Sequence, residues 1–252
     1  MPRLSSARQA NSKRLINKAG YHALIDFSSI IALSKKQLHG RLDFKMIIAI
    51  DGPAASGKGT IAKKLANKLN ILCLDTGAIY RAIAVCDLRG KDYTTSKIEI
   101  QCGADKQTLV YLDGEDITNQ IRTVEVGARV PVLALDPLVQ DRVHKIQHAT
   151  ARDQSLVVEG RETTSVAFPH ADFKFYVFAS LEERARRRLR DFIQKGENIT
   201  YEEVLRLTAE RDRLDMEREV APLIKVAEAI EIDTTGRVAD EVVDEMLAII
   251  LN

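Results

Sequence analysis

The stretch MIIAIDGPAASGKGT, residues 46–60, decides the fold of this chain. Its apolar run from Ile47 to Ile50 is typical of a buried strand. Gly52, Gly57 and Lys58 follow with the spacing G-x-x-x-x-G-K, in which backbone N–H groups and one ammonium surround a polyphosphate. A helix begins directly afterwards and adds its N-terminal dipole to the same anion. The stretch therefore predicts a phosphate-binding loop between a strand and a helix.

The expected phosphate-binding positions run without a gap from the first glycine to the first hydroxyl after the lysine. They are Gly52, Pro53, Ala54, Ala55, Ser56, Gly57, Lys58, Gly59 and Thr60. The order Gly-Lys-Gly-Thr is the variant typical of small kinases. A glycine-rich turn that binds nothing is the alternative interpretation. Because an apolar strand precedes the loop and an amphipathic helix follows it, we favour phosphate binding.

Length and composition fit one large α/β domain, or one domain with inserts. The chain has 252 residues, of which 45% are hydrophobic and 29% charged, and its net charge is +1. Residues 1–45 hold nine Lys or Arg against two acids, so the remainder is mildly acidic and predicts no nucleic-acid binding. Apolar runs such as 238–251 are too short and too often interrupted to span a membrane. Three cysteines without a C-x-x-C pair indicate a reducing compartment.

Residues 1–45 are rich in Arg, Lys and Ser, contain no acid before Asp26, and precede a methionine where the first strand would begin. Three explanations are open: a start-site artefact with Met46 as the real first residue, an organellar targeting peptide, or a short helical appendage. We favour the first and leave the segment out of the fold prediction. The expected location is cytoplasmic, or organellar if the segment is a transit peptide.

Strands alternate with helices along the rest of the chain, which predicts a parallel sheet covered on both faces. The expected strands are 47–50, 71–74, 156–158, 173–178 and 230–232. Between the second and third of them, residues 91–123 show strand-like patterns around Gly103 and Asp105. Asp113-Gly114 is a hairpin-turn signal, so we predict a small β-rich insert.

Helical spacing returns over residues 124–151, where Pro131 and Pro137 are expected to break the helix. Two charged helices are expected over 181–194 and 201–218. A closing amphipathic helix is expected over the last apolar run of the chain.

Phosphoryl transfer needs a cradle for the donor, positive charge around the travelling group and a seat for the acceptor. Lys58 supplies the cradle cation. Arg81 follows the second strand and Arg161 the third, so both are expected at the carboxyl edge of the sheet, where open α/β sheets bind ligands. Glu159 ends the third strand. It either orients water on a Mg²⁺ shared with Thr60, or is an ordinary strand-end carboxylate.

Arg184, Arg187 and Arg188 share one helical side at spacings of three and four. A solvated charged face is the plain interpretation of such a run. Like charges at those spacings repel, however, unless an anion lies among them. We therefore predict a lid that closes on phosphate.

Two further groups of polar residues carry weaker signals. Arg211, Asp215 and Arg218 share a helical face, where internal salt bridging is the simplest interpretation. His144 and His148 stand four residues apart, but without Cys or acid partners they predict no metal site. No Ser-His-Asp grouping can be identified.

Together these motifs resemble the cytidylate kinase family, P-loop nucleoside monophosphate kinases that phosphorylate CMP and dCMP with ATP and Mg²⁺. The resemblance covers roughly the last four-fifths of the chain, from Met46 onward. The matching segments are IAIDGP (48–53), GKGT (57–60), LDTGAIYR (74–81), GEDIT (114–118), IRT (121–123), GR (160–161), RA (184–185), RR (187–188), RD (211–212), Arg218, APL (221–223) and IDTT (232–235). Several ordered motifs are far more specific than the loop alone.

The resemblance implies an α/β fold of the P-loop NTPase type. Its parts would be a three-layer sandwich with a five-stranded parallel core sheet, a small β-rich monophosphate-binding insert and a helical lid. The kinase domain would span residues 46–252, with the insert at about 91–150 and the lid at about 181–218. The implied catalytic residues are Lys58, Arg161, Arg184 and Arg188.

Substrate positions are implied by the same resemblance. The acceptor phosphate would contact Thr76, Arg81, Arg161 and Arg218, and the ribose would contact Arg211 and Asp215. The implied small molecules are CMP or dCMP and ATP, with Mg²⁺ as the metal cofactor. Neither a nucleic acid nor a membrane is an expected partner, and we expect a monomer.

Three positions at which the family recognises the base differ here. The family usually carries Asp-Gly-Arg-Asp after the third strand, where this chain has Glu159 and Glu162, each one methylene longer. A family serine and arginine correspond to Pro131 and Gln140. Because arginine only donates whereas glutamine donates or accepts, we expect relaxed cytosine selectivity. The alternatives are a kinase for another nucleoside monophosphate, and a catalytically weak nucleotide-binding regulator.

Overall fold

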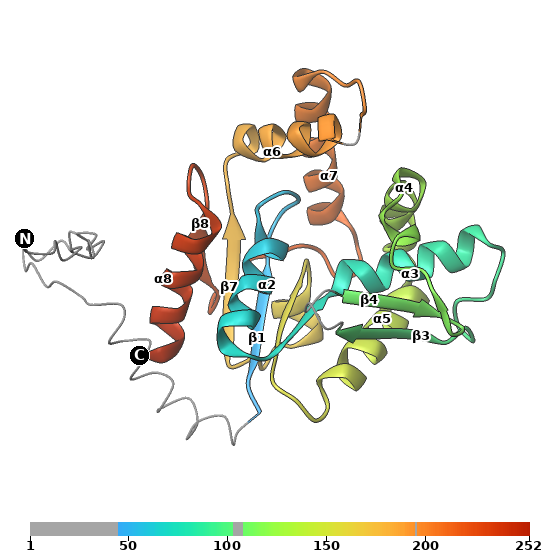
Figure 1. Cartoon of the computed structure of the whole chain (residues 1–252), viewed down its shortest axis with the longest axis horizontal. Helices are drawn as coiled ribbons and strands as arrows, with labels where there is room; N and C mark the ends of the chain where they lie inside the picture. The colour runs from blue at the N-terminus through green and yellow to red at the C-terminus, as the bar shows by residue number, and fades with distance from the viewer. Residues whose placement is uncertain (1–44, 103–107, 195) are drawn as a thin grey trace, which may run out of the picture. The chain divides into compact units, whose positions relative to one another are not determined.

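The structure is a computed structural model that describes residues 45–102, 108–194 and 196–252. The chain divides into two units, residues 1–44 and 45–252, of which only the second is described. The possible helical appendage in residues 1–45, and Gly103 and Asp105 of the insert, therefore lie outside the described residues. Figure 1 shows how the elements of the second unit are arranged.

A five-stranded parallel sheet forms the centre of the domain, as the alternating pattern predicts (Figure 1). Its strands are β1 (Ile47–Asp51), β2 (Leu72–Asp75), β6 (Leu156–Gly160), β7 (Phe173–Phe178) and β8 (Ile230–Asp233). Their order is β2-β6-β1-β7-β8, so β1 lies in the middle and pairs with both β6 and β7. The carboxyl ends of β1 and β6 are therefore neighbours at one edge of the sheet.

Helices cover the sheet and its carboxyl edge. They are α2 (Lys58–Leu69), α3 (Thr76–Leu88), α4 (Val124–Leu133), α5 (Pro137–Ala151), α6 (Leu181–Gln194), α7 (Tyr201–Glu217) and α8 (Ala239–Leu251). Ala49 and Val158 lie in one core cluster with residues of α3 and α5. Because side chains alternate along a strand, the buried Ile48 and Ile50 point to the opposite face, where α2 packs against α8.

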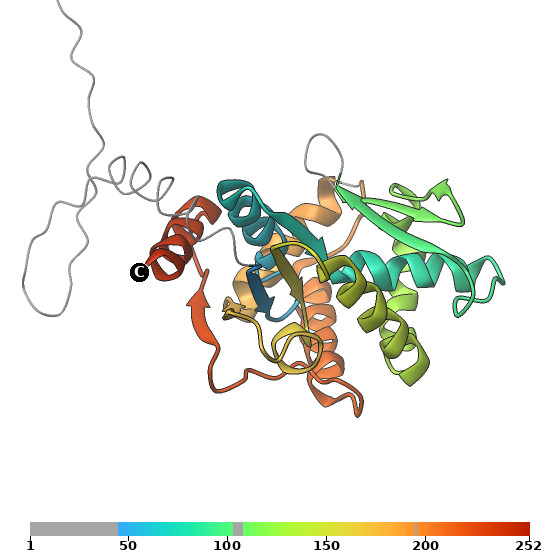
Figure 2. The same cartoon turned by 90° about the horizontal axis from the view of Figure 1, so that it is seen from below.

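The β-rich insert is a three-stranded antiparallel sheet, visible beside α3 in Figure 2. Its strands are β3 (Ile98–Cys102), β4 (Thr108–Leu112) and β5 (Glu115–Asp116). Asp113 and Gly114 join β4 to β5 with φ angles of 53° and 86°. Both central residues of this two-residue turn have positive φ, as a turn that follows the right-handed strand twist requires. The hairpin prediction is confirmed.

The prediction that Pro131 breaks a helix is wrong. The proline lies inside α4, which continues to Leu133, and the actual break falls between α4 and Pro137. A proline at this position removes one N–H donor close to the helix end. The two residues after Val132, Leu133 and Ala134, are 5% and 4% exposed, so their burial favours continuing the turn.

Two short helical segments were not predicted from the sequence. They are the 3₁₀ turn η1 (Gln120–Arg122) and the π-helical segment η2 (Thr163–Ala167). The remaining element boundaries fall within a few residues of those expected. No helix in the described ranges is long and apolar enough to cross a bilayer.

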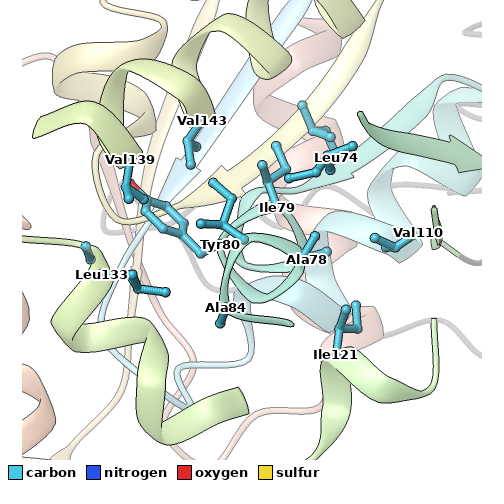
Figure 3. Packing of buried hydrophobic residues seen from close by; sticks show 14 of the residues in the cluster. Leu74, Ala78, Ile79, Tyr80, Ala84, Val110, Ile121, Leu133, Val139 and Val143 are labelled. Carbon is cyan, nitrogen blue, oxygen red and sulfur yellow. The ribbon is translucent and has the colours of Figure 1, made fainter. Parts of the chain in front are cut away.

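The packing around α3 places one polar group deep inside the domain. Figure 3 shows the Tyr80 side chain extending from α3 toward Val139 of α5, with Leu133 of α4 nearby. Tyr80 is 5% exposed, and Val139 and Val143 are fully buried. A buried tyrosine needs a hydrogen-bond partner for its hydroxyl, which directs attention to the polar residues around it.

We expect the described domain to fold without residues 1–45. Hydrogen bonding of the first strand begins at Met46, whose N–H donates to Ser155 Oγ at 2.9 Å and whose carbonyl accepts from Leu156 N at 3.0 Å. A chain starting at Met46 should keep its free energy of unfolding within about 0.5 kcal/mol of the full chain in urea. A loss above about 2 kcal/mol would show that the extension belongs to the domain. A chain starting at Gly52, which lacks β1, should fail to fold.

Candidate functional site

The predicted phosphate-binding loop connects the carboxyl end of β1 to α2. A Cβ built on Gly52 would lie 1.9 Å from the Val177 carbonyl oxygen, so only glycine fits there. Gly57 precedes α2 with φ 91° and provides no side-chain cap. The first turn of α2 also lacks acidic residues, so its N–H groups and positive dipole end have no side-chain anion of their own.

Lys58 is the buried cation of this loop. Its Nζ donates to the Pro53 carbonyl at 3.2 Å and lies 4.0 Å from Glu159 Oε2. Burial and the nearby Arg161 lower the pKa of Lys58 to about 8, against Glu159 and other carboxylates that raise it. The ammonium is therefore held in a setting where additional negative charge would stabilise it.

Glu159 belongs to the loop surroundings rather than to an isolated strand end. A Cβ on Gly59 would lie 3.4 Å from Glu159 Oε1, which places the carboxyl beside the first turn of α2. Burial and the neighbouring Asp75 raise the pKa of Glu159 to about 7, against Lys58 and Arg161. Thr60, in the same turn of α2, has an exposed side chain.

Asp51 anchors the segment that follows β6, a role not identified from the sequence. Thr163 donates to Asp51 Oδ1 from its N–H and its hydroxyl, at 2.9 and 2.7 Å. Thr164 donates to Oδ2 in the same two ways, at 2.7 and 2.6 Å. The Asp51 carboxylate is fully buried, and each of its oxygens receives two hydrogen bonds. These bonds fix the start of η2 and thereby the direction of the residues before it.

Asp215 brings two of the predicted arginines together. Arg161 Nε donates to Asp215 Oδ2 at 2.9 Å, and Arg211 Nε lies 3.1 Å from both Asp215 oxygens. Although burial raises the pKa of Asp215, the two guanidinium groups hold it below its usual range. The predicted salt bridge along α7 is therefore present and extends to the residue after β6.

The three α6 arginines that the sequence singled out, Arg184, Arg187 and Arg188, have different partners. Arg184 is buried and donates to the Ala54 carbonyl and to Asp212. Arg187 donates to the Ser56 carbonyl at 3.1 Å and to the backbone and hydroxyl of Thr234. Two of the three thus hold the outer side of the phosphate-binding loop, which the charge pattern did not predict.

Arg188 remains close to another cation. Its guanidinium lies 5.7 Å from the centre of the Phe192 ring, and burial together with Arg211 lowers its pKa. Among Arg184, Arg187 and Arg188, this is the one whose surroundings match the predicted repulsion between like charges. An anion between Arg188 and Arg211 would relieve that repulsion.

A second buried group lies around Glu162, which is 1% exposed. Arg218 donates to Glu162 Oε2 at 2.7 Å, and the Tyr80 hydroxyl lies between Glu162 and Gln140. Two of the three expected base-reading positions, Gln140 and Glu162, are thus joined by a tyrosine that the sequence did not single out.

The remaining predicted acceptor residues lie at the start of α3. Asp75 caps this helix by accepting from Ala78 N at 3.2 Å. A Cβ on Gly160 would lie 2.5 Å from Thr76 Oγ1, so Thr76 stands directly beside the end of β6. The Arg81 guanidinium folds back over the first turn, 3.1 Å from where a Cβ of Gly77 would be. Thr76 and Arg81 are therefore at the same sheet edge as Arg161.

Within the described residues, no three His, Cys, Asp or Glu side chains are grouped to hold a metal ion. His148 Nε2 lies 2.6 Å from the Ala167 carbonyl, so its ring has a structural partner. The buried Cys86 thiol donates to the Ser96 hydroxyl oxygen at 3.4 Å. A hollow of about 340 Å³ opens beside Arg218 and includes Leu135 and Leu214 in its lining.

Comparison with known proteins agrees with the family resemblance. The family model for cytidylate kinase matches residues 48–252. A cytidylate kinase of Clostridioides difficile is 42% identical over 79% of this chain and 95% of its own length. Those of Anoxybacillus flavithermus and Symbiobacterium thermophilum are both 41% identical, over 80% and 79% of this chain and 94% and 93% of their own. Among solved structures, TT1252 from Thermus thermophilus aligns at 21% identity with a TM-score of 0.46, over 82% of this chain and 96% of that chain.

Asp51→Asn should destabilise the protein strongly. An asparagine would turn an NH₂ group toward two of the four donors that Asp51 satisfies. Because hydrogen bonds to charged groups contribute about 1.5–3 kcal/mol each, we expect a loss of about 3 kcal/mol in urea unfolding. Asp92→Asn is the matched control, since Asp92 accepts from Thr94 and Thr95 at an exposed site and should cost under about 1 kcal/mol. Equal losses in the two variants would contradict the anchoring role.

Proposed function

This chain belongs to the cytidylate kinase family, and we propose that it transfers the γ-phosphoryl group of ATP to CMP or dCMP, forming CDP or dCDP. One observation carries the proposal. An anion cradle with a buried lysine opens at the same sheet edge as Arg161, Arg211 and Asp215. A donor and an acceptor that both carry phosphate can therefore meet in one place, as in-line transfer requires.

On the donor side, the loop from Gly52 to Thr60 would bind the ATP phosphates. Its support is the uncapped start of α2 and the absence of room for side chains at Gly52. Lys58 would leave the Pro53 carbonyl and contact the transferred group, where its charge stabilises the transition state. Arg184 would hold the loop through the Ala54 carbonyl. Arg161 and Arg188 would offset the negative charge on the transferred phosphoryl group.

The residues present fit Mg²⁺ as the metal. This ion is usually held by one or two carboxylates together with substrate phosphates and several waters. The Thr60 hydroxyl in the first turn of α2 would hold it there, together with the Glu159 carboxyl beside that turn, acting through water. When bound, Mg²⁺ neutralises charge on the donor phosphates. An ionised Glu159 is needed for that role, and the loss of its proton is favoured by a nearby cation.

On the acceptor side, Thr76, Arg81, Arg161 and Arg218 would bind the phosphate of the monophosphate. Arg211 and Asp215 would contact its ribose. No general base is needed, because the attacking phosphate oxygen is already anionic. The β-rich insert at about 91–150 and the lid at about 181–218 would move as the cleft closes and excludes water. We keep a monomer and a cytoplasmic location as predictions.

One observation favours a second proposal, that the enzyme accepts other nucleoside monophosphates beside CMP and dCMP. Gln140 uses Nε2 on the Ala134 carbonyl and Oε1 on the Tyr80 hydroxyl, so its amide is engaged inside the protein. Pro131 offers no side-chain hydrogen bond. A pocket with fewer donors for the cytosine ring should discriminate less against UMP.

Lys58→Ala should abolish most activity while leaving the fold intact. Removing one preorganised charge contact commonly lowers kcat by about 10²–10³-fold, and we expect a loss of that size in a coupled ADP-release assay. Lys64→Ala is the matched control, because Lys64 lies on the same helix and pairs with Asp240 at an exposed site. Activity of Lys58→Ala within a few-fold of the control would refute the assigned role.

Acceptor selectivity is measured by kcat/KM for CMP, dCMP, UMP, dTMP, AMP and GMP. We expect turnover of UMP or another monophosphate beside CMP. The prediction fails if CMP is preferred over every non-cytosine acceptor by about 10⁴ or more, the range of selectivity that hydrogen-bonded sites reach. Such a result would show that Gln140 and Glu162 preserve the cytosine pocket.

A further inference from the structure

A chain of buried polar groups joins α3, α5, the end of β6 and the end of α7. The Tyr80 hydroxyl lies 2.6 Å from Gln140 Oε1 and 2.9 Å from Glu162 Oε1. Gln140 Nε2 donates to the Ala134 carbonyl at 2.7 Å, and Arg218 donates to Glu162 Oε2 at 2.7 Å. Tyr80, Gln140 and Glu162 are 5%, 3% and 1% exposed. The hydrogen atoms in the hydrogen bonds between these three side chains must therefore belong to the side chains themselves rather than to solvent.

Counting protons gives the charge state of Glu162. Only Nε2 of Gln140 can donate to the Ala134 carbonyl, so Oε1 faces Tyr80 and needs a donor. The single Tyr80 proton satisfies it. The 2.9 Å contact between Tyr80 and Glu162 then requires a proton from the Glu162 carboxyl. In the opposite arrangement, Tyr80 would donate to Glu162 and two oxygens would face each other at 2.6 Å without a hydrogen.

Both positively and negatively charged groups surround Glu162. The charged or titratable groups near Glu162 are Arg218 from the end of α7, Asp51 from β1, Tyr80 from α3 and Arg161 after β6. Burial raises the pKa of Glu162, Arg218 lowers it, Asp51 raises it, and a hydrogen bond donated by Tyr80 would lower it, with a net increase. Burial and Glu162 also raise the pKa of Tyr80, so the hydroxyl keeps its proton.

We propose that Tyr80 and Glu162 form a proton-holding pair that leaves the charge of Arg218 free for the acceptor phosphate. With Glu162 neutral, Arg218 has no other acid within ion-pair distance among the residues that the structure describes. A buried guanidinium without a counterion attracts an anion strongly. The inference rests on the proposed function, because that function assigns Arg218 to the phosphate of the nucleoside monophosphate.

The proposal couples proton binding to phosphate binding. A phosphate beside Arg218 takes over the role of counterion and so raises the proton affinity of Glu162. Linkage requires the reverse effect of equal size, so a protonated Glu162 raises the affinity for the phosphate. Tyr80 is a positioning residue here, because it acts through Glu162 and Gln140 rather than on the phosphate.

The first test needs no nucleotide. Glu162→Gln imitates the neutral acid: its NH₂ can donate to Tyr80 and its carbonyl can accept from Arg218. For a carboxyl whose pKa is raised by folding, stability is full below the unfolded pKa and is lost as the pH rises to the folded pKa. The unfolding equilibrium constant of the full chain, relative to Glu162→Gln, should therefore increase with pH from about 4.3, by up to about tenfold per unit, and then level off.

The opposite slope, or no slope, would overturn the proposal, because an ionised Glu162 paired with Arg218 gains stability as the pH rises. Tyr80→Phe removes the hydroxyl that receives the proton and should shift the levelling point to lower pH. Tyr93→Phe is the matched control, since the Tyr93 hydroxyl donates to Asp136 at 2.7 Å outside this group. The proposal also fails if both tyrosine variants shift the curve equally.

The second test measures CMP binding by calorimetry between pH 5 and 9. The phosphate of CMP titrates near pH 6 on its own, so the Kd of the full chain is divided by that of Glu162→Gln. This ratio should rise with pH, by up to about tenfold per unit above the folded pKa of Glu162. A flat ratio overturns the coupling to the acceptor. If the stability slope is present while the ratio is flat, the failure lies in the assignment of Arg218 to the acceptor phosphate.

Discussion

The rest of the site depends on the buried carboxylate of Asp51. A buried charge is costly unless it is fully hydrogen-bonded, and the four donors of Thr163 and Thr164 meet that requirement. Asp51 is the last residue of β1, so the phosphate-binding loop starts directly after it. Thr163 follows Glu162 directly, so the same carboxylate sets the direction of Arg161 and Glu162. One interaction thereby fixes the phosphate-binding loop and the residues after β6 relative to each other.

Burial makes two charged groups beside the phosphate-binding loop harder to ionise. The pKa of Lys58 falls to about 8 and that of Glu159 rises to about 7, because desolvation disfavours both ionised forms. Both pKa values thus lie close to neutral pH, so small changes in the surroundings can change the protonation of either group. A polyphosphate beside Lys58 would raise the pKa of its ammonium, and a divalent cation beside Glu159 would lower the pKa of its carboxyl. In the proposed function, both groups would therefore be most fully ionised when the donor phosphates and Mg²⁺ lie beside them.

Features that depend on local pattern could be predicted from the sequence. Strands β1 and β6 begin as apolar runs that are buried on both faces, and the Asp113-Gly114 turn follows from backbone geometry alone. The phosphate-binding loop is recognisable because its spacing encodes a conformation. The exception is Pro131, where the burial of the residues after it outweighed the local preference.

Features that depend on distant residues could not be predicted. Tyr80 and Glu162 are 82 residues apart, and Thr163 lies 112 residues from Asp51, so no local pattern links them. The charge run of α6 predicted crowding but not its outcome, because a guanidinium can donate to carbonyl oxygens as well as to anions. Which of these a given arginine meets is decided by the path of the loop beside it.

The contacts of α6 limit how the lid can move. Arg184 and Arg187 donate to carbonyl oxygens of the phosphate-binding loop, and Arg187 also binds Thr234 after β8. The first half of α6 is thus hydrogen-bonded to two parts of the core, so it could not move without breaking these bonds. If residues of the proposed lid move, the hinge would therefore lie beyond these contacts, toward the end of α6 and the start of α7. In the proposed closure, the first turns of α6 would stay with the core, so the moving part of the lid would be shorter than residues 181–218.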